Sequence, residues 1–189
     1  VNTANIGTGQ SVAIVGLGGV GRNALLASIA SGAGKVVVVD VNEKKLMIAS
    51  QLGAHYTFNS TLKNCTEQIL DLTDGGVHYA FETAGVPPAL DLAYKITKRG
   101  GMTIVAGMPG PEAKITLSHL SLSAEERIIK GSYMGSCVPN RDIPRYIDLY
   151  KNESLPVDKL IGERFSFDGL NEALDRLDDG EALRQILIF

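Results

Sequence analysis

Four glycines and one aspartate near the start of the chain have a spacing that could support chemistry. Gly16, Gly18 and Gly21 follow an apolar run with G-x-G-x-x-G spacing, with Gly19 between them, and Asp40 closes the next apolar run. In such a turn the first glycine permits a tight bend, the second lets backbone approach a pyrophosphate, and the third lets a helix pack on its strand. The helix that follows would offer free N–H groups and a positive dipole end to the anion. The pattern therefore predicts a dinucleotide site.

Asp40 is expected to determine whether the chain prefers NAD or NADP. A carboxylate at the end of the second strand accepts a hydrogen bond from the 2′-hydroxyl of the adenosine ribose and repels a 2′-phosphate. At about 4 Å and an effective dielectric constant of about 20, that repulsion is roughly 4 kcal/mol. We therefore expect NAD rather than NADP. The alternative is an aspartate that only ends a strand and caps a helix, and Lys45 could reach the ribose or only solvate its helix.

Arg22 stands in the first turn of the helix that these glycines open. A cation there opposes the helix dipole unless an anion lies nearby, which a bound pyrophosphate would supply. It could equally be exposed and point away, and that is the interpretation we adopt from the sequence.

The bulk properties exclude several classes of protein. The chain has 189 residues, a net charge of −3 and interspersed acids and bases, so no basic face for nucleic acid is expected. No apolar run is long enough to cross a membrane. Cys65 and Cys137 lack partners at metal-ligand spacing, and we interpret them as reduced thiols of a cytoplasmic protein. The chain lacks an initiator methionine and signal-peptide features, so we expect a piece of a longer reading frame or a processed product.

Short β-branched runs alternate with helical patterns along most of the chain. Continuous apolar runs of this kind suit parallel strands that are buried on both faces. The regular alternation predicts an α/β fold, a Rossmann doubly wound sheet of six parallel strands with helices on both faces. The expected strands are 11–15, 35–40, 55–59, 77–82, 101–107 and 127–133, and the expected helices are 20–32, 42–53, 64–76 and 87–101.

The alternation changes after about Tyr133. The later pattern predicts a helix over 139–154, a strand over 163–167, a helix over 168–180 and a final strand over 184–189. We therefore divide the chain into a cofactor-binding domain, residues 1–133, and a C-terminal segment, residues 134–189.

With these patterns in hand, the chain resembles the zinc-dependent alcohol dehydrogenases of the medium-chain dehydrogenase/reductase superfamily. Six blocks match that family in order through nearly the whole chain. They are "VGLGGVG" (15–21), "VDVNEKKL" (39–46), "GGVHYAFETAG" (75–85), "IVAGMP" (104–109), "KGSYMGS" (130–136) and "GEALRQILIF" (180–189).

The resemblance implies roles for particular residues. Val20 would touch the nicotinamide side, Asp40 and Lys45 would hold the adenosine ribose, and Val41 would lie beside the adenine. The strand-end residues Thr83, Ala84, Ala106, Gly107 and Met108 would line the adenosine and nicotinamide clefts. Met134 would offer backbone near the carboxamide, and Arg184 would reach back to the pyrophosphate.

The resemblance also implies what this chain lacks. In the family an N-terminal domain supplies the zinc ligands and the proton-relay hydroxyl, and no such domain precedes Val1. His55, His78 and His119 do not resemble ligands. Without a Lewis acid to polarise the substrate oxygen, hydride transfer from an alcohol loses its electrophilic partner. We therefore expect NAD binding, with zinc only in the full-length parent, no catalytic residue or metal site in this chain, and no turnover of a small alcohol or aldehyde by the chain alone.

The C-terminal tail and the segment 113–133 predict self-association. In the family the tail completes the catalytic domain, so apolar edges such as "ILIF" would be left unpaired here and would tend to pair with another chain. The segment 113–133 lies where family members meet. A homodimer or larger homo-oligomer is the expectation.

Other classes stay open on the sequence alone. A stand-alone nucleotide-binding module would need no upstream zinc-spaced cysteines and histidines. A zinc-independent quinone reductase is disfavoured by Asp40, since that branch tends towards NADP, and a methyltransferase is disfavoured by the complete glycine spacing. In the family the walls of the substrate pocket come mostly from the other half of the protein, so the resemblance does not identify the alcohol.

Overall fold

The fold is built on a six-stranded parallel sheet, as expected from the sequence. The structure, a computed structural model, describes residues 1–178 and 184–189. The strand order is β3-β2-β1-β4-β5-β6, and every neighbouring pair is parallel. The strands are β1 (Ser11–Val15), β2 (Lys35–Asp40), β3 (Tyr56–Asn59), β4 (Val77–Glu82), β5 (Thr97–Val105) and β6 (Ile128–Gly131).

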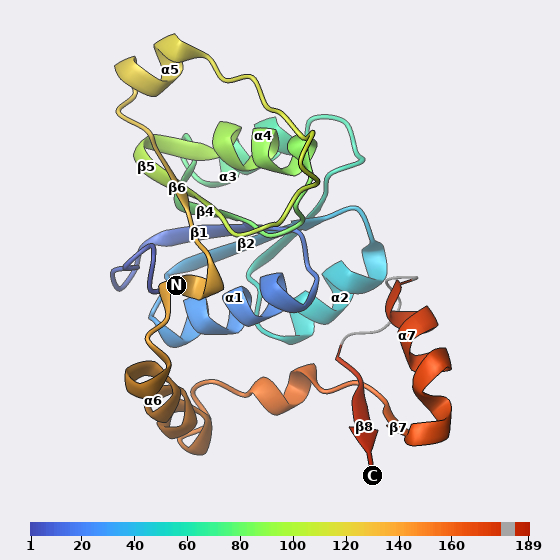
Figure 1. The fold of residues 1–189 in the computed structure, drawn as a ribbon. Coiled ribbons are helices and arrows are strands. Elements are labelled where there is room, and N and C mark those ends of the chain that lie inside the picture. Colours follow the sequence, from blue (N-terminus) through green and yellow to red (C-terminus); the bar gives the residue numbers. More distant parts are fainter. Residues whose placement is uncertain (179–183) are drawn as a thin grey trace.

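Helices cover both faces of this sheet. Figure 1 shows α1 and α2 on one face and α3 and α4 on the other, which is the doubly wound arrangement. Their bounds are α1 (Gly19–Ala30), α2 (Glu43–Gln51), α3 (Cys65–Leu72) and α4 (Pro87–Lys95). Gly32, Gly53 and Gly75, just beyond the first three helices, have positive φ angles, as the helix-ending glycines of the sequence predict.

The central strands are buried on both faces, and their side chains alternate between two apolar clusters. One cluster joins Val12, Ile14, Val36 and Val38 to Leu25 of α1 and Leu46 of α2. The other joins Ala13, Val15, Val37 and Val39 to Ile69 of α3 and Ala93 of α4. The period of two along a strand explains why an uninterrupted apolar run is needed to fill both layers.

The prediction of a helix over 87–101 is wrong at its C-terminal end. The helix stops at Lys95, and β5 begins at Thr97. Thr97 pairs with Val77 and Met102 with Tyr79, so the register shifts between these pairs. Gly100, with φ +67°, allows the intervening bend, and it is part of the strand rather than the end of a helix.

The residues between β5 and β6 contain a helix that the sequence did not predict, α5 (His119–Ala124). Ser118 caps it by accepting a hydrogen bond from the Ser121 N–H at 3.2 Å. Figure 1 shows α5 extending away from the sheet.

The C-terminal segment packs against α1. It contains the 3₁₀ turns η1 (Met134–Ser136), η2 (Val157–Leu160) and η3 (Phe167–Gly169), the helices α6 (Pro139–Lys151) and α7 (Leu170–Asp178), and the strands β7 (Arg164–Ser166) and β8 (Ile186–Ile188). Leu155 and Leu160 form a small core with Leu26 of α1. The end of the expected helix 168–180 and the first four residues of the block 180–189 lie outside the described residues.

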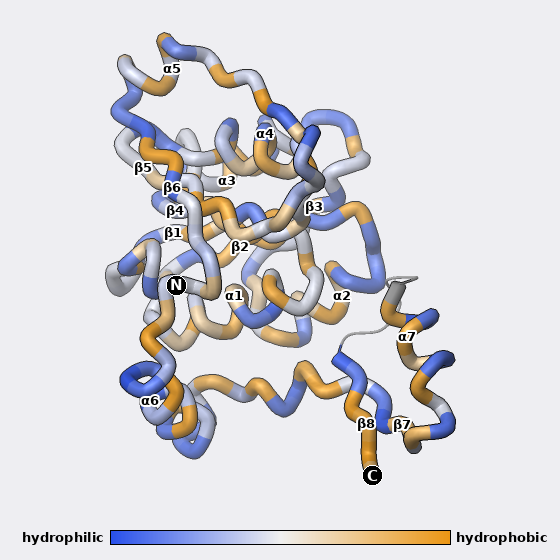
Figure 2. Tube along the Cα trace, viewed as in Figure 1, coloured by the Kyte–Doolittle hydropathy of each residue, from blue (hydrophilic) through white to orange (hydrophobic). Residues whose placement is uncertain are grey.

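The expectation that the "ILIF" strand would be unpaired is wrong. β8 pairs in parallel with β7 of the same chain, through Arg164–Ile186, Phe165–Leu187 and Ser166–Ile188. The sheet has only these two strands, and the terminal Phe189 is 98% exposed. Figure 2 shows the hydrophobic colour of β8 continuing to the C-terminus, away from the main sheet.

Alanine substitutions at a buried and at an exposed position should differ in their effect on the free energy of unfolding. Ile14→Ala should lower the free energy of unfolding by about 2–5 kcal/mol, because Ile14 is fully buried in the sheet. Met47→Ala, at a side chain that is 61% exposed, should stay within about 0.5 kcal/mol of the unsubstituted chain. Chemical denaturation measures both, and equal losses would contradict this assignment of the core.

Candidate functional site

The candidate site lies where the strand order reverses. β1 and β4 are neighbours, yet α1 and α4, the helices that follow them, lie on opposite faces of the sheet (Figure 1). The connections therefore diverge at the carboxyl ends of these two strands and leave a crevice, the usual ligand site of open α/β sheets.

The turn from β1 to α1 is shaped by two glycines that the fold itself requires. Gly16 has φ +96°, and a Cβ there would lie 2.7 Å from the Ala84 nitrogen. A Cβ on Gly21 would overlap the Gly16 carbonyl oxygen. These glycines let α1 begin in contact with the ends of β1 and β4.

Gly18 is different, because packing does not require it. A Cβ on Gly18 would meet no atom within 4 Å, although Gly18 is the N-cap of α1. No side chain caps the helix and no acidic residue stands in its first turn. The N-terminus of α1 therefore presents free N–H groups and uncompensated positive charge beside open space, which suits an anion.

Asp40 joins two strand-end turns through its carboxylate. Oδ2 accepts a hydrogen bond from the Leu17 N–H at 2.6 Å, and Oδ1 accepts one from the Asn42 N–H at 2.9 Å. The residue is 9% exposed. A carboxylate has about four acceptor positions, so these two bonds leave capacity for a ligand.

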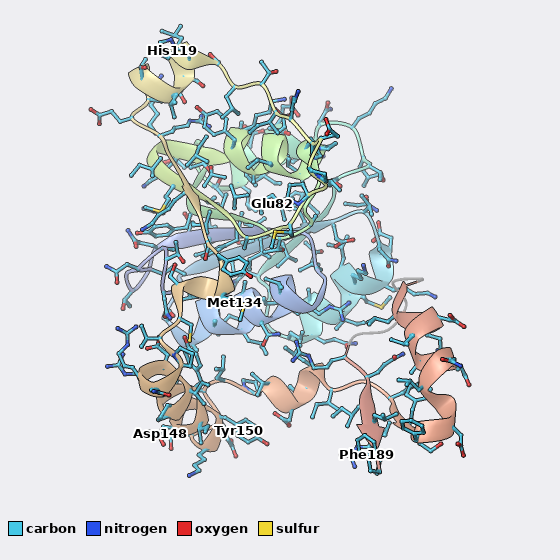
Figure 3. All side chains as sticks on the ribbon, viewed as in Figure 1. Glu82, His119, Met134, Asp148, Tyr150 and Phe189 are labelled. Atoms are coloured by element: carbon cyan, nitrogen blue, oxygen red, sulfur yellow. The ribbon has the colours of Figure 1, made fainter. Side chains whose placement is uncertain are left out.

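Glu82 and Thr83 fix the end of β4 against β1. Glu82 is 2% exposed, and its Oε1 accepts hydrogen bonds from the N–H groups of Ala84 and Gly85, at 2.8 and 2.6 Å (Figure 3). The Thr83 hydroxyl donates to the Gly16 carbonyl oxygen at 2.6 Å. The sequence did not single out Glu82, whose role is to satisfy a turn that would otherwise leave buried N–H groups unpaired.

Most of the expected site residues line one of three cavities. Gly16, Asp40, Val41 and Ala84 line a cleft of about 510 Å³, which is large enough to hold an adenosine and is called the adenosine-sized cleft below. Val20, Thr83, Ala106 and Met134 line a second cleft of about 560 Å³, on the α1 side of the sheet. Gly19 and Arg184 line a narrow cavity at the start of α1.

The remaining expected residues lie at or near this crevice without lining those cavities. Lys45 is half-buried in the first turn of α2, where its backbone N–H donates to Asn42 Oδ1. Gly107 packs against Gly85 and Glu82, and Met108 is 75% exposed. Gly18 and Gly21 belong to the turn itself.

Two contributions were missed from the sequence. The loop after β3 adds Ser60, Thr61, Leu62 and Asn64 to the adenosine-sized cleft, and the position of β3 beside β2 was the signal that could have found it. The interpretation of Arg22 as an exposed residue is wrong. Arg22 is only 3% exposed, and it lines a narrow cavity with Leu160 and Arg184 of the C-terminal segment.

The histidines and cysteines lie apart. Nδ1 of His55 accepts a hydrogen bond from the Val36 N–H, and Nδ1 of His78 is bonded to Ser11, while His119 begins α5, far from Glu82 in Figure 3. Both cysteines are free. Among residues 1–178 and 184–189, no group of three or more His, Cys, Asp or Glu side chains is placed to hold a metal ion, so this part of the chain does not fit a zinc site. None of the helices in these ranges has the length and apolar character needed to cross a membrane.

Comparison with known proteins agrees with this geometry. The zinc-binding dehydrogenase family matches residues 19–152. The chain belongs to this family. It is 36% identical to a geraniol dehydrogenase of Castellaniella defragrans, over 100% of this chain and 51% of the relative, and 36% identical to alcohol dehydrogenase-like 5 of Arabidopsis thaliana, over 97% and 48%.

A solved structure extends the comparison to the fold. Benzyl alcohol dehydrogenase from Acinetobacter calcoaceticus superposes with a TM-score of 0.94 at 31% identity, over 98% of this chain and 51% of that one. The chain thus spans about half the length of the curated relatives it matches, and it corresponds to the cofactor-binding half of a medium-chain zinc alcohol dehydrogenase.

Alanine substitutions at two glycines of the turn between β1 and α1 should have different effects on stability. Gly21→Ala should lower the free energy of unfolding by about 1–3 kcal/mol or more, because the new methyl group overlaps the Gly16 carbonyl. Gly18→Ala should cost less than about 1 kcal/mol, since its Cβ enters open space and only the helix cap is weakened. Urea denaturation measures both, and a Gly18→Ala loss as large as that of Gly21→Ala would contradict the division of roles.

Proposed function

We propose that this chain binds NAD(H), with NAD preferred over NADP. The observation that carries the proposal is the Asp40 carboxylate, which lines the adenosine-sized cleft and keeps acceptor capacity after bonding Leu17 and Asn42. A ribose 2′-hydroxyl can donate to it, whereas a 2′-phosphate at about 4 Å would be repelled by roughly 4 kcal/mol.

The three cavities support an assignment of the parts of the cofactor. The adenosine would lie in the cleft with Asp40, Val41 and Ala84, and Lys45 would approach the ribose from α2. The diphosphate would lie over Gly18 and Gly19 at the α1 N-terminus, beside Arg184. The nicotinamide would enter the second cleft along Val20, Thr83, Ala106 and Met134, next to the strand-end residues Gly107 and Met108.

We further propose that the full-length parent transfers a hydride between a small alcohol or aldehyde and NAD. The relatives named above are alcohol dehydrogenases, and this chain covers about half their length. The cofactor would supply a hydride acceptor for the carbinol carbon of the alcohol, whose hydroxyl proton would pass to a base of the parent protein. This chain supplies the binding and orientation of the cofactor, and zinc belongs to the part of the parent outside it, so the chain alone binds the cofactor without turnover. Residues 1–133 form the cofactor domain and residues 134–189 the segment that completes the catalytic domain.

If Asp40 binds the ribose, substituting it should change both the affinity for NADH and the preference for NADH over NADPH. The unsubstituted chain should bind NADH at least tenfold more tightly than NADPH by isothermal titration calorimetry. Asp40→Ser should weaken NADH by about 10–100-fold, as expected for loss of a charged hydrogen bond, and should remove most of the preference. Asp91→Ser, which removes a half-exposed carboxylate on α4, is the control and should change neither.

Thermal unfolding of Asp40→Ser must be followed in parallel, because the carboxylate also holds two backbone N–H groups. Tighter binding of NADPH than of NADH by the unsubstituted chain would contradict the proposal and favour a quinone reductase.

We also propose a cytoplasmic homodimer or larger homo-oligomer. Support comes from the free edge of β6, where Ile128 is 46% exposed, and from α5, where Leu120 is 76% exposed. The two free thiols suit a reducing compartment.

Light scattering after size-exclusion chromatography should give at least twice the 20.1 kDa mass of the chain at micromolar concentration. Ile128→Lys should shift the mass towards the monomer by placing a charge on the edge strand. A monomer for the unsubstituted chain would count against self-association.

A further inference from the structure

Within the part of the chain that the structure describes, the buried guanidinium of Arg22 has no hydrogen-bond or ion-pair partner. Its side chain, in the first turn of α1, is 3% exposed, and its Nε and Nη1 atoms have no hydrogen-bond acceptor. None of the ion pairs in the described part of the chain includes it. Burial lowers the pKa of the guanidinium, and the nearby Asp40 carboxylate opposes that shift. Buried charges in proteins are almost always paired, so this arrangement calls for an anion.

A second arginine approaches the same helix end. Arg22 and Arg184 line one narrow cavity together with Gly19, Asn23 and Leu160. A Cβ built on Gly19 would lie 3.9 Å from Nη2 of Arg184. The cavity measures about 10 Å³, which is room for about one water, so an anion would lie at its mouth and not inside it.

Three positive features therefore meet at one place. Arg22 and Arg184 line the same cavity at the start of α1, the positive end of the helix dipole, and no acidic side chain stands in the first turn of that helix. The Asp40 carboxylate lies near Arg22, but among the described residues no hydrogen bond or ion pair joins the two side chains. A doubly charged diphosphate would balance the two arginines, and arginine is the residue best suited to its oxygens.

We propose that Arg22 is a binding residue for the diphosphate of the dinucleotide, acting from beneath the α1 N-terminus while Arg184 acts from the solvent side. The inference rests on the proposed function and adds a residue that the glycine motif does not predict. Free inorganic phosphate would be held by the same chemistry more weakly, because it lacks the adenosine anchor.

A purely structural role for Arg22 makes the opposite prediction for stability. If Arg22 mainly stabilised the fold through Asp40, its removal would lower the melting temperature of the free chain. If it is held unpaired for a ligand, replacing it with an apolar side chain of similar length should leave that temperature unchanged or raise it. The sign of the shift distinguishes the two roles.

The test compares Arg22→Met with Arg99→Met, an exposed arginine on β5 whose loss changes net charge equally. Calorimetric titration with ADP-ribose should show at least tenfold weaker binding for Arg22→Met and no change for Arg99→Met. Adenosine, which lacks phosphate, should bind all three proteins equally. Arg22→Lys, which keeps the charge and loses the planar fork, should fall between, and inorganic pyrophosphate should compete less well in Arg22→Met.

Several outcomes would overturn the inference. They are unchanged ADP-ribose affinity in Arg22→Met, an equal loss of adenosine binding, or a lowered melting temperature or failure to fold of the free Arg22→Met chain. If the unsubstituted chain binds neither ADP-ribose nor NADH, the proposed function fails first. If it binds both and Arg22→Met binds them equally well, only the role of Arg22 fails.

Discussion

The site depends on the carboxylate of Asp40, which ties together two turns that belong to different strands. By accepting hydrogen bonds from the Leu17 and Asn42 N–H groups, it fixes the glycine turn after β1 relative to the start of α2. The close approach of Gly16 and Gly21 then sets α1 against the strand ends. Because these turns also form the walls of the adenosine-sized cleft, one side chain organises the backbone and lines the cleft. Holding the two turns and lining the cleft both require an acidic residue at position 40, so the sequence alone does not distinguish these two roles.

Much of the sheet could be predicted because its strands must be buried on both faces. The runs 11–15, 35–40 and 77–82 correspond to β1, β2 and β4, since only continuous apolar strands can fill both core layers. β5 was harder. Gly100 and Gly101 resemble the end of a helix, yet they permit a bend within a strand whose pairing with β4 is set by residues far away in the sequence. The helix α5 was missed because it has only six residues and none of them is buried, so no apolar face imposes a helical period.

The parts of the site that follow a local motif were predictable, and the parts created by packing were not. The glycine spacing and Asp40 lie within one strand-helix-strand unit, so their positions follow from the chain itself. Arg22 lines a cavity with Leu160 of η2 and with Arg184, which come more than a hundred residues later in the chain, so its surroundings depend on tertiary packing. The contribution of Ser60 and Thr61 likewise depends on β3 lying beside β2. The pairing of β7 with β8 shows the same limit, since no local pattern indicates that these two short strands would pair with each other.

The central claim is that the crevice at the β1–β4 switch point holds NAD with its ribose on Asp40. A crystal structure of this chain grown with saturating NAD tests it most directly. The account predicts the adenosine in the cleft lined by Asp40 and Val41, a ribose hydroxyl within hydrogen-bond distance of the Asp40 carboxylate, and the diphosphate over Gly18 and Gly19. Electron density for the nucleotide at any other place, or a ribose turned away from Asp40, would contradict it.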